Sequence, residues 1–167
     1  GDDLTLAVVG AQLSNAFEVA TGLSEEGISV ELLYFTSLKP FDSEELQNSV
    51  EKTGALLTVE ELSTRSGLFD RCLRAVAGID GVKFGQLAIH DFIHTYGTYQ
   101  ELCASVGLDA DGIRRKILEL IENRGALREI GKKSRRFVER YHSLEAVGSV
   151  FETINQSFGL LPSCTNA

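Results

Sequence analysis

The chain has 167 residues, of which 43% are hydrophobic and 24% charged, and its formal net charge is −8. This composition is typical of a globular domain with its own core, and the negative charge argues against nucleic acid as a general partner. No apolar run approaches the roughly 20 residues that a membrane helix needs, so we expect no membrane partner. Because the first residue is not Met, we expect the chain to be a piece of a longer polypeptide.

The first part of the chain predicts strands that alternate with helices. An apolar run over 4–9 predicts a buried strand that ends at Gly10. A helix follows and ends near Gly27, and its apolar stripe consists of Leu13, Phe17, Ala20 and Leu23. A second strand is predicted over 28–35, a helix over 44–52, and a third strand over 55–59.

A joint over 36–42 connects the second strand to its helix. Pro40 fixes its own φ and restricts Lys39 to extended backbone, so the strand cannot run straight into the helix. Asp42 or Ser43 then offers a side-chain oxygen that caps the helix.

The same alternation continues with a helix over 68–77, a strand over 82–89 and helices over 99–106 and 111–123. This order predicts a three-layer α/β fold, in which a mostly parallel sheet of about five strands carries helices on both faces. In such sheets, ligands bind at the carboxyl ends of the strands.

A change of charge near residue 123 predicts a domain boundary. Residues 1–123 have a charge balance of −11, whereas residues 124–140 have a balance of +5. Residues 124–161 carry apolar side chains at spacings of three and four, which predicts a basic, amphipathic extension of two helices. We expect residues 162–167 to form a disordered tail.

Glycine and polar residues at the strand ends form a candidate site for a small anion. Gly10 ends the first strand and opens a helix, whose N–H groups attract anions. The dinucleotide-binding fingerprint needs three glycines and this turn has one, so a plain turn is the favoured interpretation. The candidate residues are Gly10, Ser14, Glu60, Ser66, Gly67 and Asp91.

Glu60 and Glu61 end the third strand. Adjacent strand residues point to opposite faces, so these two carboxylates do not form an acid–base pair. We expect one of them to cap or orient the loop that contains Ser66 and Gly67.

His90, Asp91 and His94 lie beyond the fourth strand and suggest a metal site, but no further well-placed ligand accompanies them. A structural role for Asp91, which accepts backbone N–H groups or caps the turn, is the favoured interpretation. We therefore predict no catalytic, cofactor-binding or metal-binding residue in the chain.

Three cysteines, Cys72, Cys103 and Cys164, lie far apart in the chain and are odd in number. This spacing predicts neither a disulfide framework nor a zinc site. We expect reduced thiols in a cytoplasmic protein.

Four short motifs follow one another in this chain. They are the Gly10 turn with Glu26–Val30, Leu38–Asp42, Leu57–Glu61 with Ser66–Leu68, and Asp91–Gly97 with Glu101–Leu102 and Gly107–Ile113. Their order resembles the C-terminal domain of the transketolase family, which includes transketolase, deoxyxylulose-phosphate synthase and the β subunit of 2-oxo acid dehydrogenase E1. The resemblance covers residues 4–122. Ser66, Tyr96 and His90 depart from the family pattern, which often has Gly, His and Pro there.

The resemblance implies a non-catalytic assembly or dimerisation domain that is inactive alone. In this family thiamine diphosphate and Mg²⁺ are held by other domains, so we expect both in the full enzyme and neither in this chain. The implied partners are the remaining transketolase domains or subunit, within a homodimer. Residues 125–158 also resemble the C-terminal helix pair of glycosyltransferases.

An alternative function from another class remains open. A free-standing, flavodoxin-like module of the same fold would bind a small anionic ligand at the carboxyl ends of its strands.

Overall fold

The computed structural model describes residues 1–122, and the chain divides into two units, Gly1–Asn123 and Arg124–Ala167. The predictions for residues 124–161, for the tail 162–167 and for the glycosyltransferase-like segment 125–158 lie outside the described residues.

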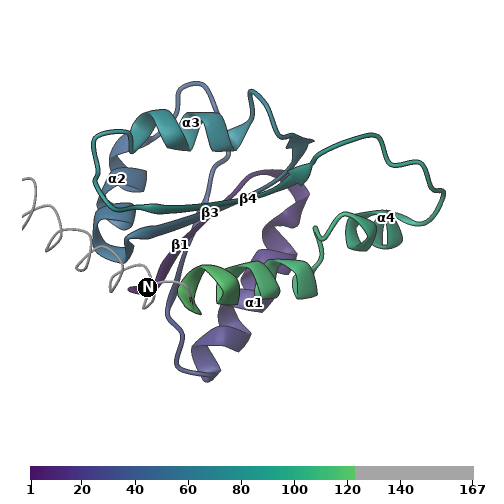
Figure 1. The fold of residues 1–167 in the computed structure, drawn as a ribbon, viewed down its shortest axis with the longest axis horizontal. Helices are drawn as coiled ribbons and strands as arrows, with labels where there is room; N and C mark the ends of the chain where they lie inside the picture. Colours follow the sequence, from purple (N-terminus) through teal and green to yellow (C-terminus); the bar gives the residue numbers. More distant parts are fainter. Residues whose placement is uncertain (123–167) are drawn as a thin grey trace, which may run out of the picture. The chain divides into compact units, whose positions relative to one another are not determined.

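The centre of the first unit is a parallel sheet of four strands in the order β2-β1-β3-β4 (Figure 1). The strands are β1 (Leu4–Val8), β2 (Val30–Tyr34), β3 (Ala55–Ser63) and β4 (Lys83–Ile89). The parallel α/β class is thus confirmed, with four strands in the described residues where the sequence predicts about five. Every residue of β1 is buried, as expected for a central strand covered on both faces.

Helices cover both faces of the sheet (Figure 1). On one face lie α1 (Leu13–Glu25), which follows the short 3₁₀ turn η1 (Gly10–Gln12), and a helix over 110–122. The other face carries α2 (Ser43–Thr53) and α3 (Leu68–Ala75). The last helix with both ends described is α4 (Tyr99–Ser105).

Alternation along β1 divides the core into two layers. Leu4, Leu6 and Val8 belong to the cluster beneath α1, whereas Ala7 belongs to the cluster beneath α2 and α3. Thr5 faces α2, and its hydroxyl lies 2.8 Å from the Ser49 hydroxyl and 2.7 Å from that of Thr53. This polar contact satisfies a hydroxyl that is otherwise fully buried.

The predicted joint before α2 is confirmed. The Asp42 carboxylate accepts a hydrogen bond of 3.2 Å from the backbone N–H of Glu45, which is the N-cap interaction. The helix ends at Gly54, whose φ of 65° is the left-handed conformation that glycine adopts without strain.

The predicted stripe of the first helix is partly wrong. Phe17 is 64% exposed, whereas Ala16, Val19 and Leu23 are buried. These three residues recur at the same helical spacings of three and four as the predicted stripe. Periodicity alone does not separate two such neighbouring stripes.

The later helices also bury one apolar side each. Leu68 and Cys72 of α3 are buried together with Val76, which follows the helix, and Ile113 and Ile117 are buried on the helix over 110–122. Within the described residues, none of the helices is long and apolar enough to span a membrane.

Two fully buried threonines in neighbouring strands provide a matched test of the core. Thr58 is the one buried side chain in the described residues whose hydroxyl has no hydrogen-bond partner, whereas the hydroxyl of Thr5 has two. Thr58→Val should therefore raise the free energy of unfolding by about 1 kcal/mol, because it removes an unpaired buried polar atom. Thr5→Val should lower it by about 1–2 kcal/mol. Urea denaturation measures both, and a destabilised Thr58→Val would contradict the assignment.

Candidate functional site

The carboxyl ends of parallel strands meet at one edge of a sheet, which is where ligands bind in this class of fold. In this chain the edge includes the turn after β1, the end of β3, the loop over 90–98 and α4 (Figure 1). We call this region the carboxyl edge.

Glu60 lies near the end of β3 and is fully buried. Its carboxylate accepts hydrogen bonds from the backbone N–H groups of Leu68 (2.7 Å) and Phe69 (3.1 Å), in the first turn of α3. The side-chain amide of Gln86 donates a third bond of 3.2 Å. Gly67, the N-cap residue of α3, has no side chain to offer, so Glu60 caps this helix from the neighbouring strand. The predicted capping role of the Glu60–Glu61 pair is thus confirmed for Glu60.

The loop between β3 and α3 is shaped by this carboxylate. A Cβ atom on Gly67 would lie 1.8 Å from Oε2 of Glu60, so only glycine fits there. Ser66 adopts a φ of 66°, in the left-handed region that glycine adopts without strain and other residues rarely occupy. The backbone N–H of Ser66 donates to the carboxylate of Asp70, which holds the loop in this conformation.

Glu61 points to the opposite side of the sheet, as the alternation of a strand predicts. Its carboxylate accepts hydrogen bonds from the side-chain amide of Gln12 (2.8 Å) and from the hydroxyl of Tyr99. The hydrogen bond to Glu61, together with desolvation, raises the pKa of the Tyr99 hydroxyl, which therefore stays protonated as a donor.

Gln12 is the centre of this second network and is fully buried. Its amide nitrogen also lies 3.1 Å from the Tyr99 hydroxyl and 3.5 Å from the sulfur of Cys103, while its oxygen accepts from Asn15 at 2.9 Å. Gln12 thus connects the turn after β1 with β3 and α4.

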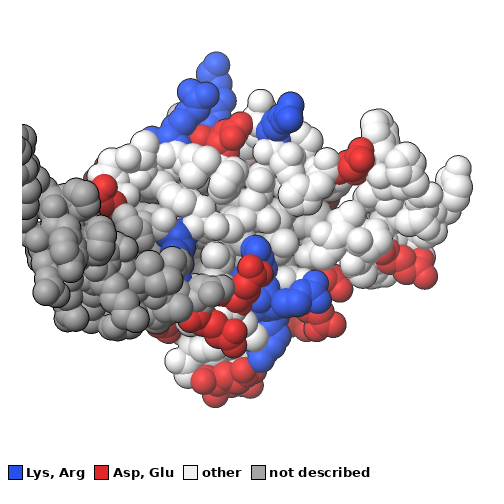
Figure 2. Space-filling view, in the orientation of Figure 1, with Lys and Arg blue, Asp and Glu red and all other residues white. Residues whose placement is uncertain are grey.

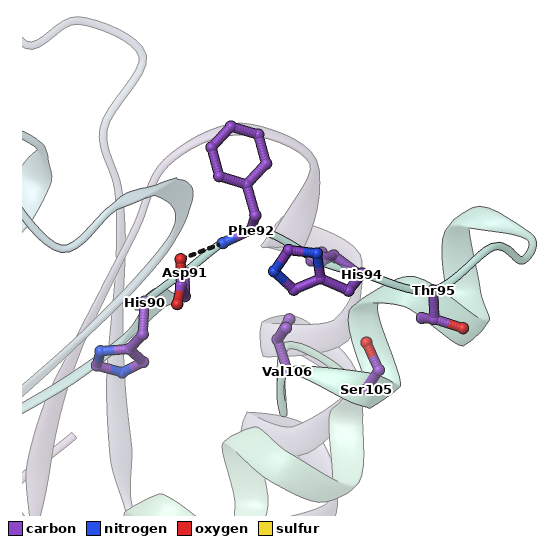
Figure 3. A pocket seen from close by; sticks show the side chains of 8 residues that line it. His90, Asp91, Phe92, His94, Thr95, Ser105 and Val106 are labelled. Carbon is purple, nitrogen blue, oxygen red and sulfur yellow. Dashed lines mark hydrogen bonds between the residues drawn. The ribbon is translucent and has the colours of Figure 1, made fainter.

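The loop over 90–98 borders a hollow of about 480 Å³ beside α4 (Figure 3). The side chains of His90 and His94 lie well apart there, and Asp91 accepts a 2.7 Å hydrogen bond from the N–H of Phe92 (Figure 3). This is the structural role predicted for Asp91. Within residues 1–122 no group of three His, Cys, Asp or Glu side chains could hold a metal ion.

The loop ends in a reciprocal cap on α4. The Thr98 hydroxyl accepts from the N–H of Glu101, and the Glu101 carboxylate accepts a 2.7 Å bond from the N–H of Thr98. These contacts lower the pKa of Glu101, chiefly through the backbone N–H of Thr98. The capping-box pattern T-x-x-E was a usable signal in the sequence. No local pattern pointed to Gln12 and Tyr99, because their contact joins residues 87 positions apart.

The six residues of the candidate anion site do not form one cluster. Gly67 contacts Glu60, and Ser66 lies beside them in the chain. Gly10 and Ser14 are exposed on the turn and first helix after β1, and no hydrogen bond in the described part of the chain joins them to Glu60. Asp91 is exposed in the loop after β4.

These features define a doubly wound parallel α/β domain whose strand ends are filled by its own side chains. The family model "Transketolase, C-terminal domain" matches residues 1–113. The chain therefore belongs to the family of transketolase C-terminal domains.

Two curated relatives illustrate the family. The chain is 30% identical over 128 residues to 1-deoxy-D-xylulose-5-phosphate synthase 1 of Geobacter sulfurreducens, a match that covers 75% of this chain and 20% of that protein. It is 30% identical over 124 residues to the 6-deoxy-6-sulfo-D-fructose transketolase subunit SqwH of Clostridium sp., covering 74% of this chain and 38% of that subunit. The chain thus spans well under half the length of these relatives.

A solved structure has the same fold. The structure titled "Split gene transketolase, inactive beta4 tetramer" matches with a TM-score of 0.67 and 29% identity, over 73% of this chain and 40% of that one.

Gly67 offers a sharp test of the buried cap. Gly67→Ala should lower the free energy of unfolding by about 3 kcal/mol, because its Cβ would displace the carboxylate that caps α3. Gly78→Ala is the matched control, since a Cβ there meets nothing within 4 Å, and it should change stability little. Chemical denaturation compares the two variants, and equal effects would contradict the proposed role of Glu60.

Proposed function

We propose that this chain supplies the C-terminal, non-catalytic assembly domain of a cytoplasmic, thiamine-diphosphate-dependent transferase of the transketolase family. The observation that carries the proposal is the filled carboxyl edge. Glu60 occupies the amino end of α3, and the Gln12–Glu61–Tyr99 network occupies the ends of β1 and β3. Because the polar groups of this edge are already bonded to one another, the edge is better suited to support a neighbouring protein surface than to bind a ligand.

The described residues do not fit thiamine diphosphate and Mg²⁺. The backbone N–H groups at the amino end of the helix after β1 would attract a diphosphate. However, Gln12 in this turn is hydrogen-bonded to the carboxylate of Glu61, whose negative charge disfavours a bound diphosphate. No three acidic or histidine ligands meet among residues 1–122. We infer that both groups are held by other parts of the full enzyme.

The partners that fit this function are the remaining transketolase domains or a separate subunit, within a homodimer or a larger homo-oligomer. The Clostridium relative is named as a transketolase subunit, and the solved structure is described as a β4 tetramer. Buried free thiols at Cys72 and Cys103 support a cytoplasmic location, where thiols stay reduced.

The alternative of a free-standing anion-binding module has less support from the site. An anion beside the first turn would lie near Glu61, and the N–H groups of α3 that would attract it are already bonded to Glu60.

The test compares the complete parent protein with a variant that lacks residues 1–122. The variant should lose its native oligomeric mass, measured by light scattering, and with it most of its activity. Isothermal titration of the 167-residue chain with thiamine diphosphate and Mg²⁺ should show no binding. Micromolar binding to the chain, or unchanged mass and activity of the shortened parent, would refute the proposal.

A further inference from the structure

The loop after β4 and the helix α4 contribute little to the core. Among residues 90–105, which we call the strap, the one buried side chain is that of Cys103, which is 8% exposed. The loop runs away from the sheet before the chain turns back into α4 (Figure 1). Segments with few buried apolar contacts open at a lower cost in free energy than the core does. The strap is therefore a segment that can open while the core stays folded.

The strap has few attachments to the rest of the domain. The hollow of about 480 Å³ is lined by residues 90–95 of the loop and by the end of α4, so the loop does not pack closely on that helix (Figure 3). The hydrogen bonds that Asp91 and Thr98 make join strap residues to one another. The surface around α4 is mostly uncharged in the view of Figure 2, and none of the ion pairs within residues 1–122 includes a strap residue.

The polar attachment of the strap is the hydroxyl of Tyr99. It donates to the carboxylate of Glu61 and accepts a 3.1 Å hydrogen bond from the side-chain amide of Gln12. Tyr99 and Cys103 share one face of α4, and the same amide nitrogen lies 3.5 Å from the sulfur of Cys103. A hydrogen bond to a carboxylate is stronger than one between neutral groups. The bond to Glu61 thus holds the amino end of α4 against the sheet.

The other end of the strap is fixed by packing. Leu108 follows α4, is 1% exposed and belongs to the core cluster beneath α1. Its backbone N–H donates a 2.9 Å hydrogen bond to the carbonyl oxygen of Cys103. Between the helix and Leu108, Gly107 adopts a φ of 73°, a left-handed conformation that is unstrained for glycine. A helix that is packed at its carboxyl end and hydrogen-bonded at its amino end can tilt about the packed end once the hydrogen bond breaks.

We propose that the strap is a hinged lid that the hydrogen bond between Tyr99 and Glu61 holds closed. When this bond breaks, α4 tilts about Leu108 and uncovers the thiol of Cys103 and the amide of Gln12. Opening is possible because water can bond the polar groups that the lid releases. The carboxyl edge thus has a closed form, which the structure shows, and a less populated open form. The lid is a property of this chain itself and does not depend on the proposed assembly function.

The first experiment measures how fast iodoacetamide alkylates each cysteine of the 167-residue chain, followed by peptide mass spectrometry. Tyr99→Phe keeps the ring and removes the hydroxyl, so alkylation of Cys103 should become at least about tenfold faster. The matched control Tyr96→Phe removes a hydroxyl from a fully exposed side chain of the same strap and should leave the rate at Cys103 unchanged. Cys72, fully buried in α3, is the internal control and should stay unreactive in both variants.

Three results of this experiment would overturn the inference. An unchanged rate at Cys103 in Tyr99→Phe would show that packing alone closes the strap. An equal rise in Tyr96→Phe would show that the effect is not specific to the bond with Glu61. A parallel rise at Cys72 would show that the whole domain unfolds instead of the strap alone.

The second experiment adds Glu61→Gln, which keeps the size of the acceptor and removes its charge. Alone, it should speed alkylation of Cys103 less than Tyr99→Phe does, because a neutral amide still accepts a weaker hydrogen bond. Combined with Tyr99→Phe, it should change the rate by less than about twofold, since both substitutions act on one bond. A double variant whose rate is the product of the two separate effects would contradict a lid held by that bond.

Discussion

The buried carboxylate of Glu60 is the interaction on which the carboxyl edge depends. It accepts the first free N–H groups of α3 and the amide of Gln86, so it joins β3, β4 and α3 at one point. A charge buried this completely is tolerated because three donors and the positive end of a helix surround it. The side chain of its neighbour Glu61 points to the opposite face of the sheet, where its carboxylate accepts hydrogen bonds from Gln12 and Tyr99. Two adjacent residues of one strand thus organise both faces of the edge.

The fold was largely predictable from the sequence, because strands, helices and caps are local. Asp42 as a cap, Gly54 as a helix end and the opposite orientations of Glu60 and Glu61 follow from residue type and position alone. Phe17 shows the limit of periodicity, since two neighbouring stripes share one spacing. The Gln12–Tyr99 contact shows a second limit, because a bond between residues 87 positions apart depends on tertiary packing that no local pattern encodes.

Function follows from what occupies the strand ends. In many α/β domains this edge is left open for a ligand, and glycine-rich turns let the ligand approach the backbone. Here the space beside Gly67 is taken by Glu60, and the turn after β1 is tied to a carboxylate through Gln12. Gly67 therefore leaves room for the carboxylate of Glu60, whereas the glycines of a ligand-binding turn leave room for a phosphate. What remains available at this edge is an apolar, ordered surface, which suits contact with protein.

The most direct measurement is the amide hydrogen exchange of Leu68 and Phe69, followed by NMR. The first N–H groups of a helix ordinarily lack an intrahelical partner and exchange quickly with water. If Glu60 closes the edge as described, the amides of Leu68 and Phe69 should be protected to a degree similar to those of the buried strand β3. Exchange of both amides at the rate of an unprotected chain would show that the edge is open, and would contradict a domain closed by its own side chains.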